Sequence, residues 1–239
     1  MKKHALICNL MYKLDSYEAR SDMMGLLKYM QYRNDRDKHI PQDDGFERWY
    51  DRGLGNNYRV IGNRLMYLAG DRANADEVLV RMMVVSPHPD LIAELPEWRR
   101  ARAVKEISEC MVEQYFEAQD LPVLEYSFVI HDPETEDGTP RLHSHILLPA
   151  TVPDMEGRRH YDLRRQQMPV FHEVRDRVIT DFTVGFFGVE RAKEIDLDLL
   201  TDKEKEAKKV AEPQPEIVEN EIAPEPEENL LDRWFGPGR

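Results

Sequence analysis

Three histidines in two successive apolar segments have the spacing that most directly suggests chemistry. His131 ends one segment, and His143 and His145 lie two positions apart in the next. Successive side chains of a strand point to opposite faces, so His143 and His145 share a side while Ser144 points to the other. If the two segments are adjacent strands, His131 lies near that pair. Three neutral imidazoles can bind a divalent metal ion and leave coordination positions open for a substrate oxygen.

The residue after His131 can take part in such a site. Asp132 is a candidate acceptor for a ring N–H, a contact that would orient the ring. A metal ion with three neutral ligands keeps its positive charge, which suits an anionic phosphodiester and the charge of its transition state. The alternative is that these are half-buried histidines of a sheet with ordinary hydrogen bonds.

Two tyrosines upstream are candidate nucleophiles. Tyr29 and Tyr32 lie three residues apart near the end of a predicted helix, beside Lys28 and Arg33, and so share roughly one helical face. Transesterification of a phosphodiester needs such a side-chain nucleophile, whereas hydrolysis needs only water. The alternative role for both tyrosines is packing, with the hydroxyl in water.

The elements that must position these residues follow from hydrophobic periodicity. Met23, Leu26, Leu27 and Met30 recur at helical spacing. The same reasoning along the chain predicts helices at 16–33, 97–119 and about 169–184, strands at 5–12, 58–68, 78–86, 123–131 and 142–149, and a loop at 34–57. Strands that can pair antiparallel, with helices between them, predict an α+β fold. We expect an antiparallel sheet of about five strands with helices packed mainly on one face.

Composition divides the 239 residues into two parts. The formal net charge is −13, and residues 196–239 contribute 13 acidic against 6 basic side chains, which leaves 33 acidic and 27 basic in 1–195. We expect 1–195 to form one domain and the Glu/Pro-rich stretch 196–239 to be a disordered acidic tail. The tail includes Leu230, Leu231, Trp234 and Phe235, a candidate docking motif for an accessory protein. The alternative is a terminus without a partner.

The sequence also excludes several classes. No window approaches the ~20 apolar residues that a bilayer requires, and the first residues lack a secretory pattern, so we expect neither a membrane span nor secretion. Cys8 and Cys110 lie in a predicted buried strand and a helix, where a free thiol acts as a small hydrophobe. These features predict a cytoplasmic protein without a disulfide framework. The domain is only mildly acidic, so its charge does not exclude a DNA ligand.

These motifs together resemble a known family. Leu124 to Asp132, followed by Pro140 to Leu148, resembles the three-histidine motif of plasmid mobilisation relaxases, which belong to the HUH endonuclease superfamily. Leu26 to Gln31 is similar to that family's nucleophile helix, in which an aliphatic residue follows the tyrosine. The chain departs from the pattern at Ser144, where the superfamily has a hydrophobic residue between the histidines. The resemblance covers about residues 5–150.

The resemblance implies a DNA-nicking enzyme that acts on single-stranded origin DNA and initiates transfer. Tyr29 would be the nucleophile, with Tyr32 as an alternative, and the product would carry a 5′-phosphotyrosyl link. His131, His143 and His145 would be the metal ligands. The family implies Mg or Mn, whereas imidazole ligands by themselves favour Zn or another transition metal, so the ion stays open. Accessory transfer or replication proteins are candidate partners of the tail.

The sequence leaves open the role of the arginines after the histidine motif and the choice between related functions. The arginines are Arg158, Arg159, Arg164 and Arg165. They can neutralise DNA phosphates, or they can be solvated surface charges. The alternative functions are a rolling-circle replication initiator of the same superfamily and a catalytically silent DNA-binding adaptor.

Overall fold

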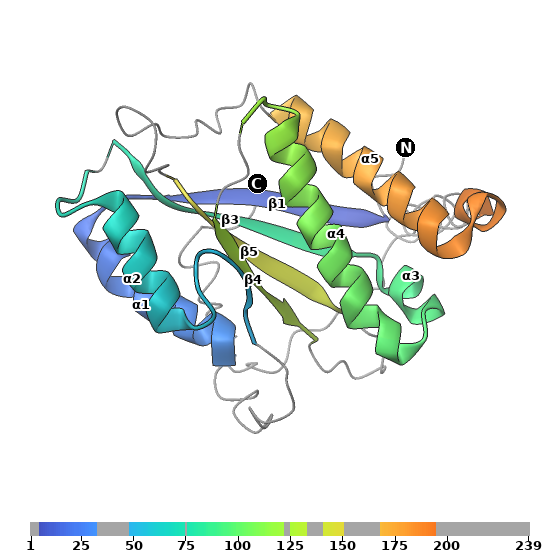
Figure 1. Ribbon diagram of the computed structural model, residues 1–239, viewed down its shortest axis with the longest axis horizontal. Helices are drawn as coiled ribbons and strands as arrows, with labels where there is room; N and C mark the ends of the chain where they lie inside the picture. The colour runs from blue at the N-terminus through green and yellow to red at the C-terminus, as the bar shows by residue number, and fades with distance from the viewer. Residues whose placement is uncertain are drawn as a thin grey trace, which may run out of the picture.

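The computed structural model describes residues 5–32, 48–74, 76–121, 125–132, 141–150 and 168–194. Its centre is a five-stranded sheet with the order β1-β3-β5-β4-β2 (Figure 1). Every neighbouring pair is antiparallel. The strands are β1 (Leu6–Leu14), β2 (Tyr50–Arg52), β3 (Val78–Pro87), β4 (Tyr126–His131) and β5 (His143–Pro149). The α+β class and the five-stranded antiparallel sheet predicted from the sequence are therefore confirmed.

Helices cover both faces of the sheet. They are α1 (Tyr17–Tyr32), α2 (Tyr58–Ala69), α3 (Pro89–Glu94), α4 (Glu97–Glu117) and α5 (Met168–Phe187). One core forms where α3, α4 and α5 pack on the sheet, and a second forms where α1 and α2 pack on the other face. Figure 1 shows the two helix pairs, α4 with α5 and α1 with α2, on opposite sides of the strands. The helices are thus divided between the faces and not gathered mainly on one, because α1 and α2 each bury an apolar stripe of their own.

The segment 58–68, expected to be a strand, is helix α2. Its aromatic and β-branched residues favour a strand locally, but Ile61, Leu65 and Leu68 form a buried helical stripe. The Asn57 side chain also accepts hydrogen bonds from the amides of Arg59 and Val60, which caps the helix. A Cβ at Gly62 would lie only 2.3 Å from Met24 Sδ of α1, so glycine permits the close approach of the two helices.

The predicted loop 34–57 contains the short strand β2. Tyr50 of β2 pairs with Phe128 of β4, and the two rings stack with centroids 4.8 Å apart. Three residues are too few for a periodic signal, so this strand depends on its tertiary partner. Beyond it, the Asp51 carboxylate accepts hydrogen bonds from the amides of Gly53 and Gly55. Those amides already have an acceptor, so this glycine pair does not form a phosphate-binding loop.

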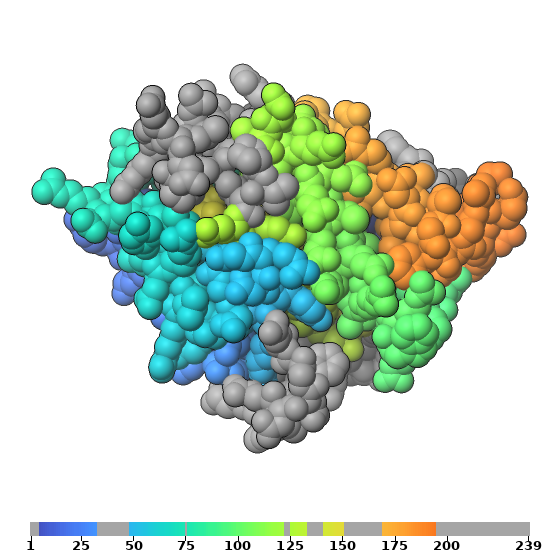
Figure 2. Space-filling model, in the orientation of Figure 1, coloured from blue at the N-terminus to red at the C-terminus, as the bar shows by residue number. Residues whose placement is uncertain are grey.

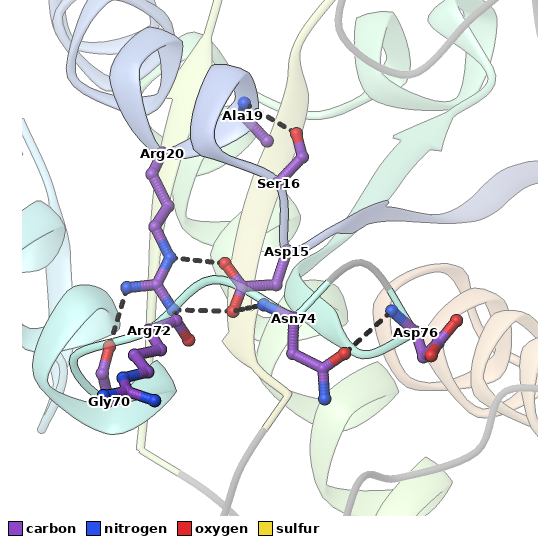
Figure 3. Close-up of polar contacts among 8 residues, drawn as sticks. All are labelled: Asp15, Ser16, Ala19, Arg20, Gly70, Arg72, Asn74 and Asp76. Atoms are coloured by element: carbon purple, nitrogen blue, oxygen red, sulfur yellow. Dashed lines mark hydrogen bonds and ion pairs between the residues drawn. The ribbon is translucent and has the colours of Figure 1, made fainter.

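A buried ion pair anchors the start of α1 (Figure 3). Arg20 Nε and Nη2 donate to the two Asp15 carboxylate oxygens at 2.5 and 2.6 Å, and both side chains are almost fully buried. The Arg20 guanidinium also donates to the Gly70 and Arg72 carbonyls, and the Asn74 amide donates to Asp15. The β1–α1 junction is thereby tied to the segment that joins α2 to β3. Ser16 completes it as the N-cap of α1, accepting from the Ala19 amide.

Some of the residues named in the sequence analysis cannot be compared with the structure, and others can. The tail 196–239 and the basic residues at 158, 159, 164 and 165 lie outside the described residues. Cys8 is buried as expected, whereas Cys110 is exposed on α4. Within the described ranges, no helix is both long and apolar enough to cross a bilayer.

Candidate active site

The three histidines converge on the sheet face that carries α1 and α2. His131 and His143 are direct antiparallel partners, and His145 pairs with Val129 two positions along. The ring centroids lie 4.9 to 5.5 Å apart. One nitrogen from each ring lies within 4.8 Å of those from the other two. His131 and His145 are buried and His143 is half-buried, so the cluster opens to solvent on one side.

Backbone carbonyls orient two of the rings. His131 Nε2 lies 2.6 Å from the Met30 carbonyl oxygen, and His143 Nδ1 lies 2.9 Å from the Arg141 carbonyl oxygen. A carbonyl only accepts, so each of these nitrogens must carry the proton. The lone pair of the neutral ring is then on Nδ1 of His131 and on Nε2 of His143. This is the arrangement in which metal-ligating histidines are usually held.

The residues present fit a divalent metal ion. Nitrogens at about 2.1 Å from one ion lie roughly 3.0 to 3.4 Å from each other, so separations that are now within 4.8 Å would shorten by up to about 1.5 Å on binding. Strand side chains can make a movement of that size by rotating, without a change of register. The three histidines can therefore hold the ion through neutral imidazoles, with coordination positions left for oxygen ligands.

Ser144 has a structural reason to stand between the two histidines. It points to the opposite face, where its hydroxyl lies 2.6 Å from the Ser108 hydroxyl of α4 in a fully buried contact. Ser108 in turn donates to the Val104 carbonyl, so Ser144 is the donor of the pair. Ser144 thus joins β5 to α4 from the face opposite the histidines.

The last turn of α1 is held beside the histidines. The final carbonyls of a helix have no partner inside it and need one from elsewhere. Here the Met30 carbonyl accepts from His131, and the Gln31 carbonyl accepts from Arg48 Nη1 at 2.8 Å. These two contacts connect the end of α1 to the end of β4 and to the segment that enters β2.

A buried glutamine strengthens that connection, and sequence reasoning missed it. The Gln31 side-chain oxygen accepts from Trp49 Nε1 at 3.1 Å and from the Tyr58 amide at 2.8 Å. Trp49 is fully buried and Gln31 nearly so. One side chain therefore links α1 to the β2 segment and to the start of α2. The only signal in the sequence is a polar residue that follows directly on the apolar stripe of α1.

The two candidate nucleophiles have different surroundings. Tyr29 is half-buried against the core between α1 and α2, and its hydroxyl makes no hydrogen bond with the described residues. Tyr32 is engaged on two sides: its ring meets Tyr58 edge to face at 6.2 Å, and the Arg48 guanidinium lies 5.2 Å from its centroid. Neither hydroxyl makes a hydrogen bond with the described residues, so the two tyrosines differ in the contacts of their rings.

Asp132 and two arginines of α4 have other surroundings. Asp132 is exposed, and the ring contacts described above are to carbonyls instead. Arg100 donates to the Leu95 and Ala93 carbonyls, and Arg102 pairs with Glu106. These two arginines stand on α4, across the sheet from the histidines.

Comparison with known proteins gives a similarity of structure but none of sequence. No protein-family model matches the chain, and no curated protein matches its sequence. A solved structure of the conjugative relaxase TrwC, metal-bound and in complex with oriT DNA, is similar at a TM-score of 0.48 and 14% identity. The similarity covers 76% of this chain and 71% of that one. At this TM-score and identity, a function has to be supported by the chain's own residues.

Proposed function

We propose that the protein nicks and rejoins single-stranded DNA by tyrosine transesterification, in the initiation of plasmid mobilisation. The observation that carries the proposal is the hydrogen bond from His131 to the Met30 carbonyl. It brings together a three-histidine cluster and the helical turn that contains Tyr29 and Tyr32. Phosphoryl transfer to a side chain with a metal ion requires a metal-ligand set and an oxygen nucleophile, and here this hydrogen bond joins the two segments that carry them.

The reaction assigns a role to each group. The Tyr29 oxygen attacks the phosphorus and loses its proton, the P–O3′ bond breaks, and the 3′-oxygen leaves as a hydroxyl. The DNA 5′-phosphate is then esterified to Tyr29, and attack by a 3′-hydroxyl reverses the step. A bound divalent ion would polarise the phosphate and offset its developing charge. His131, His143 and His145 would hold that ion, and the Met30 and Arg141 carbonyls would keep two of the rings in the ligating tautomer.

The test is a covalent adduct. Purified protein is incubated with Mg or Mn and single-stranded oligonucleotides tiled across its own replicon, and the products are run on a denaturing gel. We expect a slowly migrating protein–DNA band that Tyr29→Phe abolishes and Tyr32→Phe retains. The phenylalanine keeps the half-buried ring of residue 29 in its packing, so the loss would report on the hydroxyl.

Other results would contradict the proposal in distinguishable ways. Loss of the band only in Tyr32→Phe would show that Tyr32, and not Tyr29, is the nucleophile. Cleavage without any adduct would indicate a hydrolytic nuclease. Binding without cleavage under every metal would indicate a silent adaptor, and a nick beside a replication origin would indicate a replication initiator.

A further inference from the structure

Two tyrosines and two arginines form a cluster at the end of α1. Tyr32 and Tyr58 meet edge to face, and Arg48 lies over the Tyr32 ring. Arg59 lies 5.5 Å from the Tyr58 centroid and donates from Nε to the Tyr58 hydroxyl at 3.0 Å. We call Tyr32, Arg48, Tyr58 and Arg59 the Tyr–Arg patch. Its members come from α1, from the segment before β2 and from the start of α2.

The patch is accessible, and no carboxylate of the described residues neutralises its positive charge. Arg59 is exposed, and the other three members are half-buried. Neither Arg48 nor Arg59 forms an ion pair with any described residue, whereas Arg20, Arg52 and Arg64 each pair with a carboxylate. In Figure 2 the segment that begins at residue 48 and the neighbouring α2, coloured blue to cyan, form part of the surface. An anionic ligand can therefore reach the two guanidinium groups.

The patch also borders the histidine cluster. Arg48 donates to the Gln31 carbonyl, and the Met30 carbonyl one residue earlier accepts from His131. Patch and cluster are thus attached to consecutive peptide groups of one helix end. A chain with repeated phosphates that is held at the histidines would have its next units beside the patch.

We propose that the Tyr–Arg patch binds single-stranded DNA next to the phosphodiester that reacts at the histidines. The inference rests on the proposed function and identifies where its substrate is held. The arginines pair with backbone phosphates, and the tyrosine rings take up unstacked bases. Aromatic rings interleaved with arginines are the usual means of binding a single strand without reading its sequence. A duplex keeps its bases stacked and offers no ring face to the patch.

The experiment measures fluorescence anisotropy of a labelled single-stranded oligonucleotide of mixed sequence, in EDTA so that binding is separated from cleavage. We expect Arg48→Gln and Arg59→Gln each to lower the slope of log affinity against log salt by about 0.7. We expect Tyr58→Leu to weaken binding about tenfold and Tyr58→Phe to leave it nearly unchanged, because stacking needs only the ring. Arg102→Gln and Tyr67→Leu, both at exposed positions away from the patch, should bind as the wild type does.

The outcomes separate this inference from the proposed function. If the wild type cleaves DNA and the arginine and Tyr58→Leu variants bind it as well as the wild type does, the proposed DNA-binding role of the patch is wrong. The proposed nicking reaction is then unaffected. If these variants bind DNA more weakly but the wild type never cleaves it, DNA binding by the patch is supported and the proposed nicking reaction is wrong. Equal losses in the Arg102→Gln and Tyr67→Leu controls would overturn the patch, because binding would then follow overall charge. Circular dichroism and thermal unfolding establish that each variant is folded.

Discussion

At the scale of single residues, hydrogen bonds to carbonyls prepare the histidine cluster for a metal ion. His131 and His143 each donate to a backbone oxygen, which leaves the other ring nitrogen unprotonated. A ring held in this way does not have to change tautomer before it binds. The main chain therefore preorganises two of the three rings.

Metal binding should stabilise the protein through these rings. A ligand present at 100 times its dissociation constant adds about 2.7 kcal/mol to the free energy of unfolding. We expect thermal unfolding of the wild type to shift upward with Mn or Zn, and His143→Ala/His145→Ala to abolish the shift. The shift should weaken as the pH falls, because imidazole binds metal only when neutral. His172→Ala, at an exposed position on α5, is the matched control, and an equal loss there would contradict the assignment.

The Gln31 side chain should contribute measurably to the free energy of unfolding, because its oxygen accepts two hydrogen bonds. Gln31→Met leaves the Trp49 indole N–H and the Tyr58 amide without their acceptor, at a cost of about 1–3 kcal/mol for a buried group. We expect urea unfolding to show that loss. In a double-mutant cycle with Trp49→Phe, the combined loss should be smaller than the sum of the two single losses. Strict additivity would show that the indole hydrogen bond contributes nothing.

At the scale of elements, α1 is fixed at both ends by contacts with segments far away in the sequence. Its start is held by the Asp15–Arg20 ion pair and its end by His131, Arg48 and Gln31 (Figure 3 shows the start). The helix thus joins the β1 junction to the histidine cluster. A shift at either end would move Tyr29 relative to the rings.

Breaking the buried pair at the start of α1 should be strongly destabilising. Asp15→Asn or Arg20→Met leaves one charge buried without its partner, which costs about 3–5 kcal/mol. Denaturant unfolding should show this loss, and added salt should change it little, because the site is buried. The exposed pair of Arg102 and Glu106 is the control, and Arg102→Met should cost no more than about 0.5 kcal/mol. Similar small losses at both sites would contradict the role given to Asp15.

At the scale of the whole molecule, the sheet separates the site from much of the core. The histidines and α1 share one face, while α4 and α5 pack on the other through a large apolar cluster. The core formed by α4 and α5 contains Tyr115 and Tyr126, each almost fully buried. Changes there should alter stability without altering the chemistry of the histidine face.

Alkaline pH should destabilise the fold through these two tyrosines. Burial is the main cause that raises the pKa of each to about 12, from 10.0 for the unperturbed group, and the Glu109 and Glu113 carboxylates add to the effect at Tyr126. The folded state therefore holds these protons more tightly than the unfolded chain does. Their contribution to stability is complete below about pH 10 and is lost as the pH rises through about 12.

The measurement is urea unfolding across that pH range, with tyrosinate absorbance followed in parallel. The free energy of unfolding of Tyr115→Phe/Tyr126→Phe should fall less steeply with rising pH than that of the wild type. Tyr17→Phe, at a position that is 79% exposed, should follow the wild-type curve. An identical fall in all three proteins would show that other groups cause the alkaline loss.

The sequence by itself determined the features that depend on near neighbours. The two-residue spacing of His143 and His145 places both on one face, and the apolar stripes of α1, α4 and α5 are complete within their own segments. The strand β3 is equally local. These features could be predicted because side-chain direction in a strand or helix repeats with a fixed period.

Only the tertiary structure decided which distant groups meet. The register that sets His131 opposite His143, the contact of His131 with the Met30 carbonyl and the two bonds of Gln31 all join segments far apart in the chain. The same is true of the helix at 58–69 and of β2, whose short or ambiguous patterns are resolved by the surfaces they pack against. Pairing and burial depend on the whole fold, so no local pattern could have supplied them.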